Sequence, residues 1–180
     1  MIDTSLPPQA YVRAYELVGE FLYHFSRLEE QLNMAIAQLF KLDEPAAQIL
    51  TSSIDFAKKV SIVQAAVTEQ NASPDQKWLQ RKIKSTFKAV FAVNTERQVI
   101  AHSAFEPGSS GGVQFRRTTA SGGLLKNVDP HWDEAKFAED YQKMKKLEPD
   151  LAGVLRHIRP YVPAMDFTDP RNSGYIALLT

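Results

Sequence analysis

The chain contains no cysteine among its 180 residues. Disulfide bonds, thiolate nucleophiles and cysteine-ligated zinc sites are therefore excluded. The chain also has no net charge, because 21 Lys and Arg residues balance 21 Asp and Glu residues. Attraction of nucleic acid by the charge of the whole protein is excluded for that reason, and any such binding must come from a local patch.

Long apolar runs are also missing, and no segment of the sequence approaches the roughly 18 apolar residues that a membrane span needs. The segment before Pro8 has neither a basic start nor an apolar stretch, so it does not resemble a signal peptide. We therefore expect a cytoplasmic protein without membrane contact. The apolar fraction of 44% and the charged fraction of 23% are typical of a globular protein, and the length favours a single domain over residues 1–180.

Apolar residues recur at three- and four-residue steps over most of the chain, which is the period of an α-helix. This pattern predicts a first helix over about 8–41, which begins at Pro7-Pro8. A second helix is expected from Pro45 to about residue 70, with a break at Thr51-Ser52-Ser53, three weak helix formers in a row.

The second half of the chain predicts two further long helices. The third should run over about 74–104, because Ser73-Pro74 is a strong start signal. The fourth should run over about 132–159, with a kink or a split at Pro149. We therefore expect a mainly all-α fold, an antiparallel bundle of about four long helices.

The stretch 108–130 interrupts the helical pattern with five glycines and two alternating segments, Val113–Arg116 and Leu124–Val128. Alternation on both sides of a Ser-Gly-Gly turn predicts an inserted β-hairpin. Because two strands alone are marginally stable, we expect the hairpin to lie on the bundle or to pair with a second subunit. The C-terminal tail, about 160–180, is expected to be irregular and to pack on the surface or on a partner.

Polar residues replace apolar ones near the end of the third predicted helix. Its core stripe continues from Val90 to Asn94 and Arg97 without a change of spacing. Arginine is rare on the inward face of a bundle helix unless it is paired or lines a functional cavity. His102 follows five residues later, about 140° around the helix. Both side chains could reach one phosphate where the helix end opens into a cleft or a subunit interface.

The segment Arg97-Gln98-Val99-Ile100-Ala101-His102 resembles the Arg-x4-His signature of HEPN domains (higher eukaryotes and prokaryotes nucleotide-binding). The resemblance implies an all-α bundle with the signature late in a long helix, and a homodimer that brings both copies into one cleft. It also implies a metal-independent endoribonuclease of a toxin–antitoxin or phage-defence system, which uses no cofactor. Its partners would be RNA and a protein antitoxin.

The resemblance also implies roles for individual residues. Arg97 would hold the scissile phosphate and stabilise the charge that develops on it, since guanidinium donors suit phosphate oxygens. His102 would transfer the proton of the attacking 2′-hydroxyl or of the leaving oxygen, because imidazole can gain and lose a proton near neutral pH. In active members the residue after the arginine is most often Asn, Asp or His, whereas here it is Gln98.

A structural interpretation stands beside the catalytic one. Arg97 could pair with a carboxylate such as Glu29 and fix the helix register, while His102 caps the helix end. The chain would then be a catalytically silent helical-bundle module for protein–protein interaction. In both interpretations Glu29 is a supporting residue of Arg97. Asn94 and Gln98 lie near Arg97 on the same predicted helix.

Four basic residues form a row at steps of four, three and four on the third predicted helix: Lys77, Arg81, Lys84 and Lys88. Such a row could follow an RNA backbone, or it could be the solvated face of the helix. Trp78 and Trp132 are interpreted as core or interface anchors. The histidines show no metal-ligand spacing, so no metal site is predicted.

Overall fold

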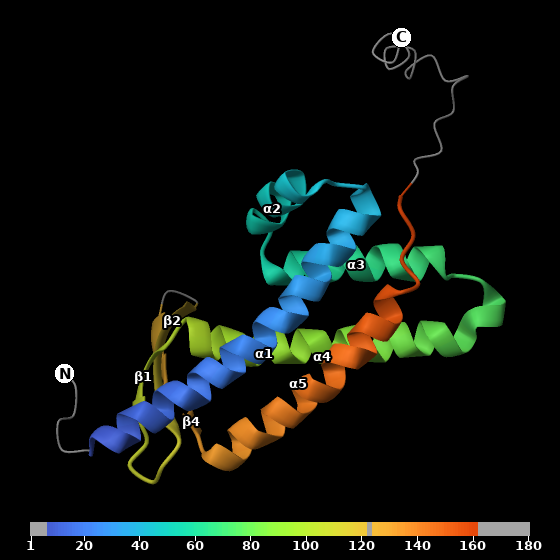
Figure 1. Ribbon diagram of the computed structural model, residues 1–180. Helices are drawn as coiled ribbons and strands as arrows, with labels where there is room; N and C mark the ends of the chain where they lie inside the picture. The colour runs from blue at the N-terminus through green and yellow to red at the C-terminus, as the bar shows by residue number, and fades with distance from the viewer. Residues whose placement is uncertain (1–6, 122–123, 162–180) are drawn as a thin grey trace, which may run out of the picture.

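The computed structural model describes residues 7–121 and 124–161 of the chain. This part is mainly helical and carries a small antiparallel sheet (Figure 1). The helices are α1 (Pro8–Phe40), α2 (Glu44–Ser52), α3 (Phe56–Gln70), α4 (Lys77–Ala101) and α5 (Glu134–Leu155), and a 3-10 turn at Pro74–Gln76 precedes α4. The strands are β1 (Ala104–Pro107), β2 (Val113–Ser121), β3 (Leu124–Val128) and β4 (His131–Trp132).

The first three helices begin and end near the predicted positions. Proline at the start of α1 fits the first helical turn, where no backbone donor is needed. The predicted break after Thr51-Ser52-Ser53 is confirmed, because α2 ends at Ser52 and α3 begins at Phe56. Both helices start at an aspartate whose side chain accepts a backbone N–H, Asp43 before α2 and Asp55 before α3.

Helix α4 is shorter than predicted. It ends at Ala101 because the residues that follow leave the helix and form β1, which pairs with β2. Helix α5 is not split at Pro149, which lies inside it. The turn around this proline is held against α1, since Gln31 donates to the backbone oxygen of Glu148 at 3.3 Å and Arg27 donates to the Glu148 carboxylate.

The predicted hairpin is present as β2 and β3, but it is not an isolated hairpin. Strand β2 pairs with β3 through its second half and with β1 and β4 through its first half, all antiparallel. In this register Phe105 lies opposite Phe115, and Val113 lies opposite Trp132. A four-stranded sheet therefore replaces the two-stranded excursion expected from the sequence, and the fold is not purely α-helical.

The helices pack around one apolar core to which each long helix contributes fully buried side chains. Phe21, Phe87 and Phe137 come from α1, α4 and α5, and each is 0% exposed. Burial of one such side chain stabilises the fold by roughly 1.5–3 kcal/mol. Trp132 is 9% exposed and packs on Phe115, so its predicted place in the core is confirmed. No helix of residues 7–121 and 124–161 is long and apolar enough to cross a membrane.

Figure 1 shows how this packing places the end of α4. Helix α1 crosses α4, while α5 and α3 each pack against both α1 and α4. The C-terminal end of α4 lies beside the sheet. Arg97 and His102 belong to this end of the helix, next to the place where the chain enters β1.

Candidate functional site

Arg97 lies in the last turns of α4 and faces α1. Its guanidinium carbon is 5.6 Å from the centre of the Phe25 ring, which is a cation–π distance. The residue is partly buried. Within residues 7–121 and 124–161 no carboxylate lies within ion-pair distance of the guanidinium. Its donors are therefore not committed to an acidic partner.

Glu29 pairs with Lys59 instead of Arg97. The Lys59 ammonium donates to Glu29 Oε1 at 2.7 Å, and the exposed fractions of the two side chains are 5% and 32%. The predicted pairing of Glu29 with Arg97 is wrong for this reason. Stacking of Phe25 on Phe56, with ring centres 4.4 Å apart, brings α1 and α3 together at this level, so the Lys59 ammonium reaches Glu29.

His102 is the residue that ends α4. Its φ of −118° and ψ of 14° are no longer helical, and its backbone N–H donates to the carbonyl oxygen of Gln98 at 3.2 Å. The expected capping of the helix end is thus made by the backbone of His102. The residue is exposed, and its imidazole makes no hydrogen bond within the part of the chain that the structure describes. The ring is available to a ligand.

Two further polar side chains at this helix end lack partners. Asn94 is 7% exposed, and its amide makes no hydrogen bond to any residue that the structure describes. The hydroxyl of Ser103, directly after His102, is buried and also without a partner. Buried polar groups in folded proteins are nearly always hydrogen-bonded, so the unmatched Ser103 hydroxyl points to a ligand, a water or a partner. Gln98 is exposed to solvent.

The structure thus brings three of the predicted residues, Asn94, Arg97 and His102, to one end of α4. Arg97 faces α1, His102 is open to solvent, and no contact joins their side chains within the described chain. A single copy therefore presents the two groups separately. A site that uses both on one phosphate needs a ligand or a second copy to bridge them.

The basic row of Lys77, Arg81, Lys84 and Lys88 lies on the exposed side of α4. None of these four side chains forms an ion pair with a residue in the described ranges 7–121 and 124–161. Three of them, with Gln80, line a shallow hollow: Lys77, Arg81 and Lys84. The neighbouring Lys82 differs, since it pairs with Asp150 at 2.6 Å.

Of the two interpretations of Trp78 from sequence, a core or an interface anchor, the structure excludes the core. Its exposed fraction is 61%, because it lies on α4 beside the basic row and away from the apolar stripe. The ring of His157 lies edge-on to the indole, with ring centres 6.5 Å apart. The indole is therefore largely exposed to solvent, and the His157 ring lies against part of it.

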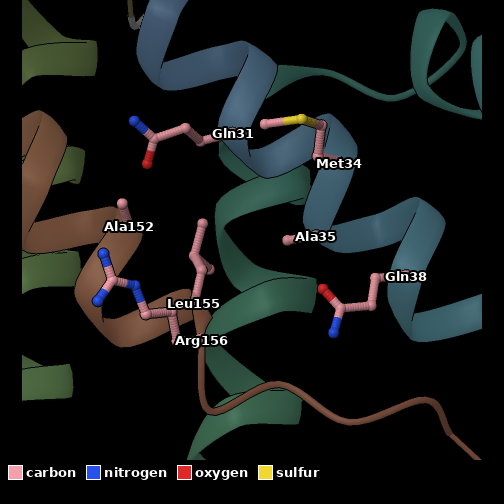
Figure 2. Close-up of a pocket in the computed structure, with 7 residues that line it drawn as sticks. All are labelled: Gln31, Met34, Ala35, Gln38, Ala152, Leu155 and Arg156. Atoms are coloured by element: carbon pink, nitrogen blue, oxygen red, sulfur yellow. The ribbon is translucent and has the colours of Figure 1, made fainter.

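The cavity drawn in Figure 2 lies away from the predicted site residues. It has a volume of about 330 Å³ and lies between α1 and α5, with Met34, Ala35 and Leu155 as its apolar wall. Gln31 lines it as well and has a buried side-chain oxygen without a hydrogen-bond partner. Among the described residues no group of three or more His, Asp or Glu side chains could hold a metal ion.

Sequence reasoning missed Phe25, Lys59 and Ser103 as residues that bear on the predicted site. Lys59 could have been found, since it lies three residues after Phe56 on the inward stripe of α3. Ser103 could have been noted as the neighbour of His102, but nothing in the sequence shows that its hydroxyl is buried. Comparison with models of known families, with curated proteins and with solved structures finds no match for this chain.

Proposed function

We propose that this protein is a HEPN-like, metal-independent endoribonuclease that works as a homodimer and uses Arg97 and His102. The observation that carries the proposal is an inward-facing arginine without an acidic partner among residues 7–121 and 124–161, five residues before an exposed histidine at the same helix end. The buried hydroxyl of Ser103, which has no hydrogen-bond partner in that part of the chain, supports a site that is completed by a ligand. A toxin–antitoxin or phage-defence system would be the biological setting.

The chemistry follows from the two side chains. One imidazole nitrogen of His102 accepts the proton of a ribose 2′-hydroxyl, and the 2′-oxygen attacks the adjacent phosphorus. Arg97 donates to the non-bridging oxygens and stabilises the charge that they gain in the transition state. The bond from phosphorus to the 5′-oxygen breaks, and that oxygen takes a proton from an imidazolium or from water. The products are a 2′,3′-cyclic phosphate and a 5′-hydroxyl end.

A homodimer is part of the proposal because no contact among the described residues of one copy joins the side chains of Arg97 and His102. In a two-fold dimer the same surface of both copies meets at the axis, so each residue is present twice in one cleft. A phosphate in that cleft could then be reached by an arginine and a histidine from different copies. An antitoxin that covered this cleft would block access to the RNA.

The experiment that tests the proposal is incubation of the purified protein with a mixed RNA in the presence of EDTA. The wild type should cut the RNA and leave 2′,3′-cyclic phosphate ends, and 2′-O-methyl RNA should remain intact because it lacks the attacking hydroxyl. His102→Ala should abolish cleavage with an unchanged melting temperature, since the imidazole is exposed and unbonded. The control is His131→Ala, which removes another exposed histidine, one whose Nε2 bonds to the Gly111 oxygen at 2.8 Å, and which should still cut. Cleavage by His102→Ala, or none by the wild type, would contradict the proposal.

The alternative function, a catalytically silent interaction module, is favoured by one observation on β3. Leu125 and Val128 are 76% and 50% exposed, and β3 is the outer neighbour of β2 in the sheet. An exposed apolar edge strand is a template for pairing with another chain, here a second copy. In that case Leu125→Lys should halve the mass measured by light scattering, while His102→Ala leaves every measured property of the protein unchanged.

A further inference from the structure

A long part of α4 carries positive charge alone. No Asp or Glu occurs between Asp75 and Glu96, while five basic residues do: Lys77, Arg81, Lys82, Lys84 and Lys88. Lys82 is neutralised by Asp150, and the other four remain without an ion pair within the described residues. In a chain with zero net charge this is a local concentration of positive charge on one exposed helix face.

The spacing of these cations suits an extended anion. At 1.5 Å per residue, successive members of the row are about 4.5–6 Å apart along the axis of α4. The row runs from Lys77 in the first turn to Lys88, about 16 Å along the axis, and His102 lies on the same side of the helix 14 residues further on. From Lys77 to His102 the helix spans about 38 Å, which corresponds to roughly eleven nucleotides at the 3.4 Å rise of a stacked strand.

Trp78 adds an exposed aromatic ring to the basic row. Its indole is 61% exposed at the start of the row, between Lys77 and the next turn, which carries Arg81. An aromatic ring beside a basic track is the arrangement on which unpaired bases stack in proteins that bind single strands.

We propose that the outer face of α4 binds single-stranded RNA, with one unpaired base stacked on Trp78 and the phosphates along Lys77, Arg81, Lys84 and Lys88. This inference rests on the proposed function, and it names the form of RNA that reaches His102. A duplex is disfavoured because its bases are already stacked and paired inside the helix, and its shape is read through the backbone. The strand would enter at Trp78 and run toward the catalytic end of α4.

The test measures binding apart from cleavage. The His102→Ala protein is titrated into a fluorescently labelled 12-nucleotide single-stranded RNA and into the corresponding 12-base-pair duplex, and anisotropy is recorded. We expect the single strand to bind more tightly than the duplex. Adding Trp78→Ala should weaken single-strand binding about tenfold or more, because base–aromatic stacking is lost. Trp78→Phe should restore most of the affinity, and Phe40→Ala, an exposed aromatic on α1, should leave it unchanged.

Intrinsic fluorescence gives a second readout, since the chain has two tryptophans and Trp132 is buried. Single-stranded RNA should quench the emission of the exposed Trp78, and Trp78→Phe should remove this quenching. The inference is overturned if Trp78→Ala binds like Phe40→Ala, if the duplex binds as tightly, or if Trp78→Ala changes the oligomeric mass, which would assign the ring to a protein interface.

These experiments test the catalytic proposal and the strand-binding proposal independently of each other. Cleavage by the wild type without any dependence of binding on Trp78 would overturn the strand path and leave the catalytic proposal standing. Binding that depends on Trp78 without any cleavage by the wild type would support the strand path and contradict the catalytic role of His102. Cleavage is measured on the wild type and His102→Ala, and binding is measured on His102→Ala alone and with Trp78→Ala, Trp78→Phe or Phe40→Ala added.

Discussion

Lys59 donates to Glu29 at 2.7 Å, and Arg97 has no acidic partner among residues 7–121 and 124–161. Glu29 lies one helical turn after Phe25, and Arg97 lies over the Phe25 ring. Two cations therefore face the same stretch of α1, which offers one carboxylate there, and the more deeply buried cation has it. The separation of these roles allows the structural and the functional contributions of the site to be measured with different substitutions.

Removal of the Glu29 carboxylate should destabilise the protein far more than removal of the Arg97 guanidinium. Glu29→Ala would strand the Lys59 ammonium, which is 5% exposed, and should lower the free energy of unfolding by about 3 kcal/mol. Arg97→Ala removes a cation–π contact and should cost about 1 kcal/mol or less. Urea denaturation measures both. The double variant Glu29→Ala/Lys59→Met should regain much of the lost free energy of unfolding. If Arg97→Ala lowered the free energy of unfolding more than Glu29→Ala, Arg97 would have a structural role.

Gly19 lies inside α1 on an exposed position and has no structural need to be glycine. A Cβ atom built there meets nothing within 4 Å, so Gly19→Ala should stabilise the protein by about 0.5–1 kcal/mol through helix propensity. Thermal unfolding should show a higher melting temperature.

Gly112 is the opposite case, because its φ is +72° and a Cβ would lie 2.3 Å from the Trp132 backbone oxygen. Gly112→Ala should lower the melting temperature, and equal effects of the two changes would contradict the placement of both.

Tyr141 should make the protein sensitive to alkaline pH. Its hydroxyl donates to the Leu17 carbonyl oxygen at 2.6 Å, and burial raises the pKa of its phenol above the ordinary value of 10.0. Above pH 10 the phenol of the unfolded chain loses its proton while that of the folded chain keeps it. The contribution of Tyr141 to the free energy of unfolding is therefore fully present below pH 10 and is lost as the pH rises further. Urea denaturation of the wild type and of Tyr141→Phe at pH 9 and pH 11 measures the effect. The wild type should lose more stability than the variant over this interval, and parallel losses would contradict the role of the phenol.

Binding of single-stranded RNA should depend strongly on salt. Each phosphate contact contributes about −0.7 to the slope of log K against log salt for a single strand, so four contacts give a slope of about −3. Lys84→Gln should make this slope less steep by about 0.7. Lys145→Gln, on an exposed position of α5, provides the control and should not change the slope. A slope near zero for the wild type would exclude the basic row from the contact.

The features of the fold that depend on neighbouring residues are predicted best from the sequence. The start of α1 at Pro8, the break after Ser52 and the hairpin of β2 and β3 each follow from residues close to the feature itself. Strand β1 was missed, because Ala104–Pro107 has no alternating pattern of its own and exists through pairing with β2. Non-local pairing of this kind leaves little trace in a short segment.

The sequence likewise predicts some parts of the candidate site and not others. The inward position of Arg97 and the place of His102 at a helix end follow from the period of the helix. The partner of Glu29 does not, because Lys59 and Arg97 both lie on inward stripes, and side-chain reach in three dimensions decides between them. The sequence leaves open whether Trp78 is a core or an interface residue, because an indole suits either place, and only the three-dimensional structure shows that it is exposed.

Two residues separate the end of α4 from the start of β1, and His102 is the first of them. The backbone at this histidine is anchored on one side by a long helix and on the other by a paired strand, so it has little conformational freedom to lose. A ligand that contacts the imidazole would meet a preorganised group and would not bear the entropic cost of ordering a loop. Amide hydrogen exchange at His102 should accordingly be slow in the free protein and change little when RNA is added.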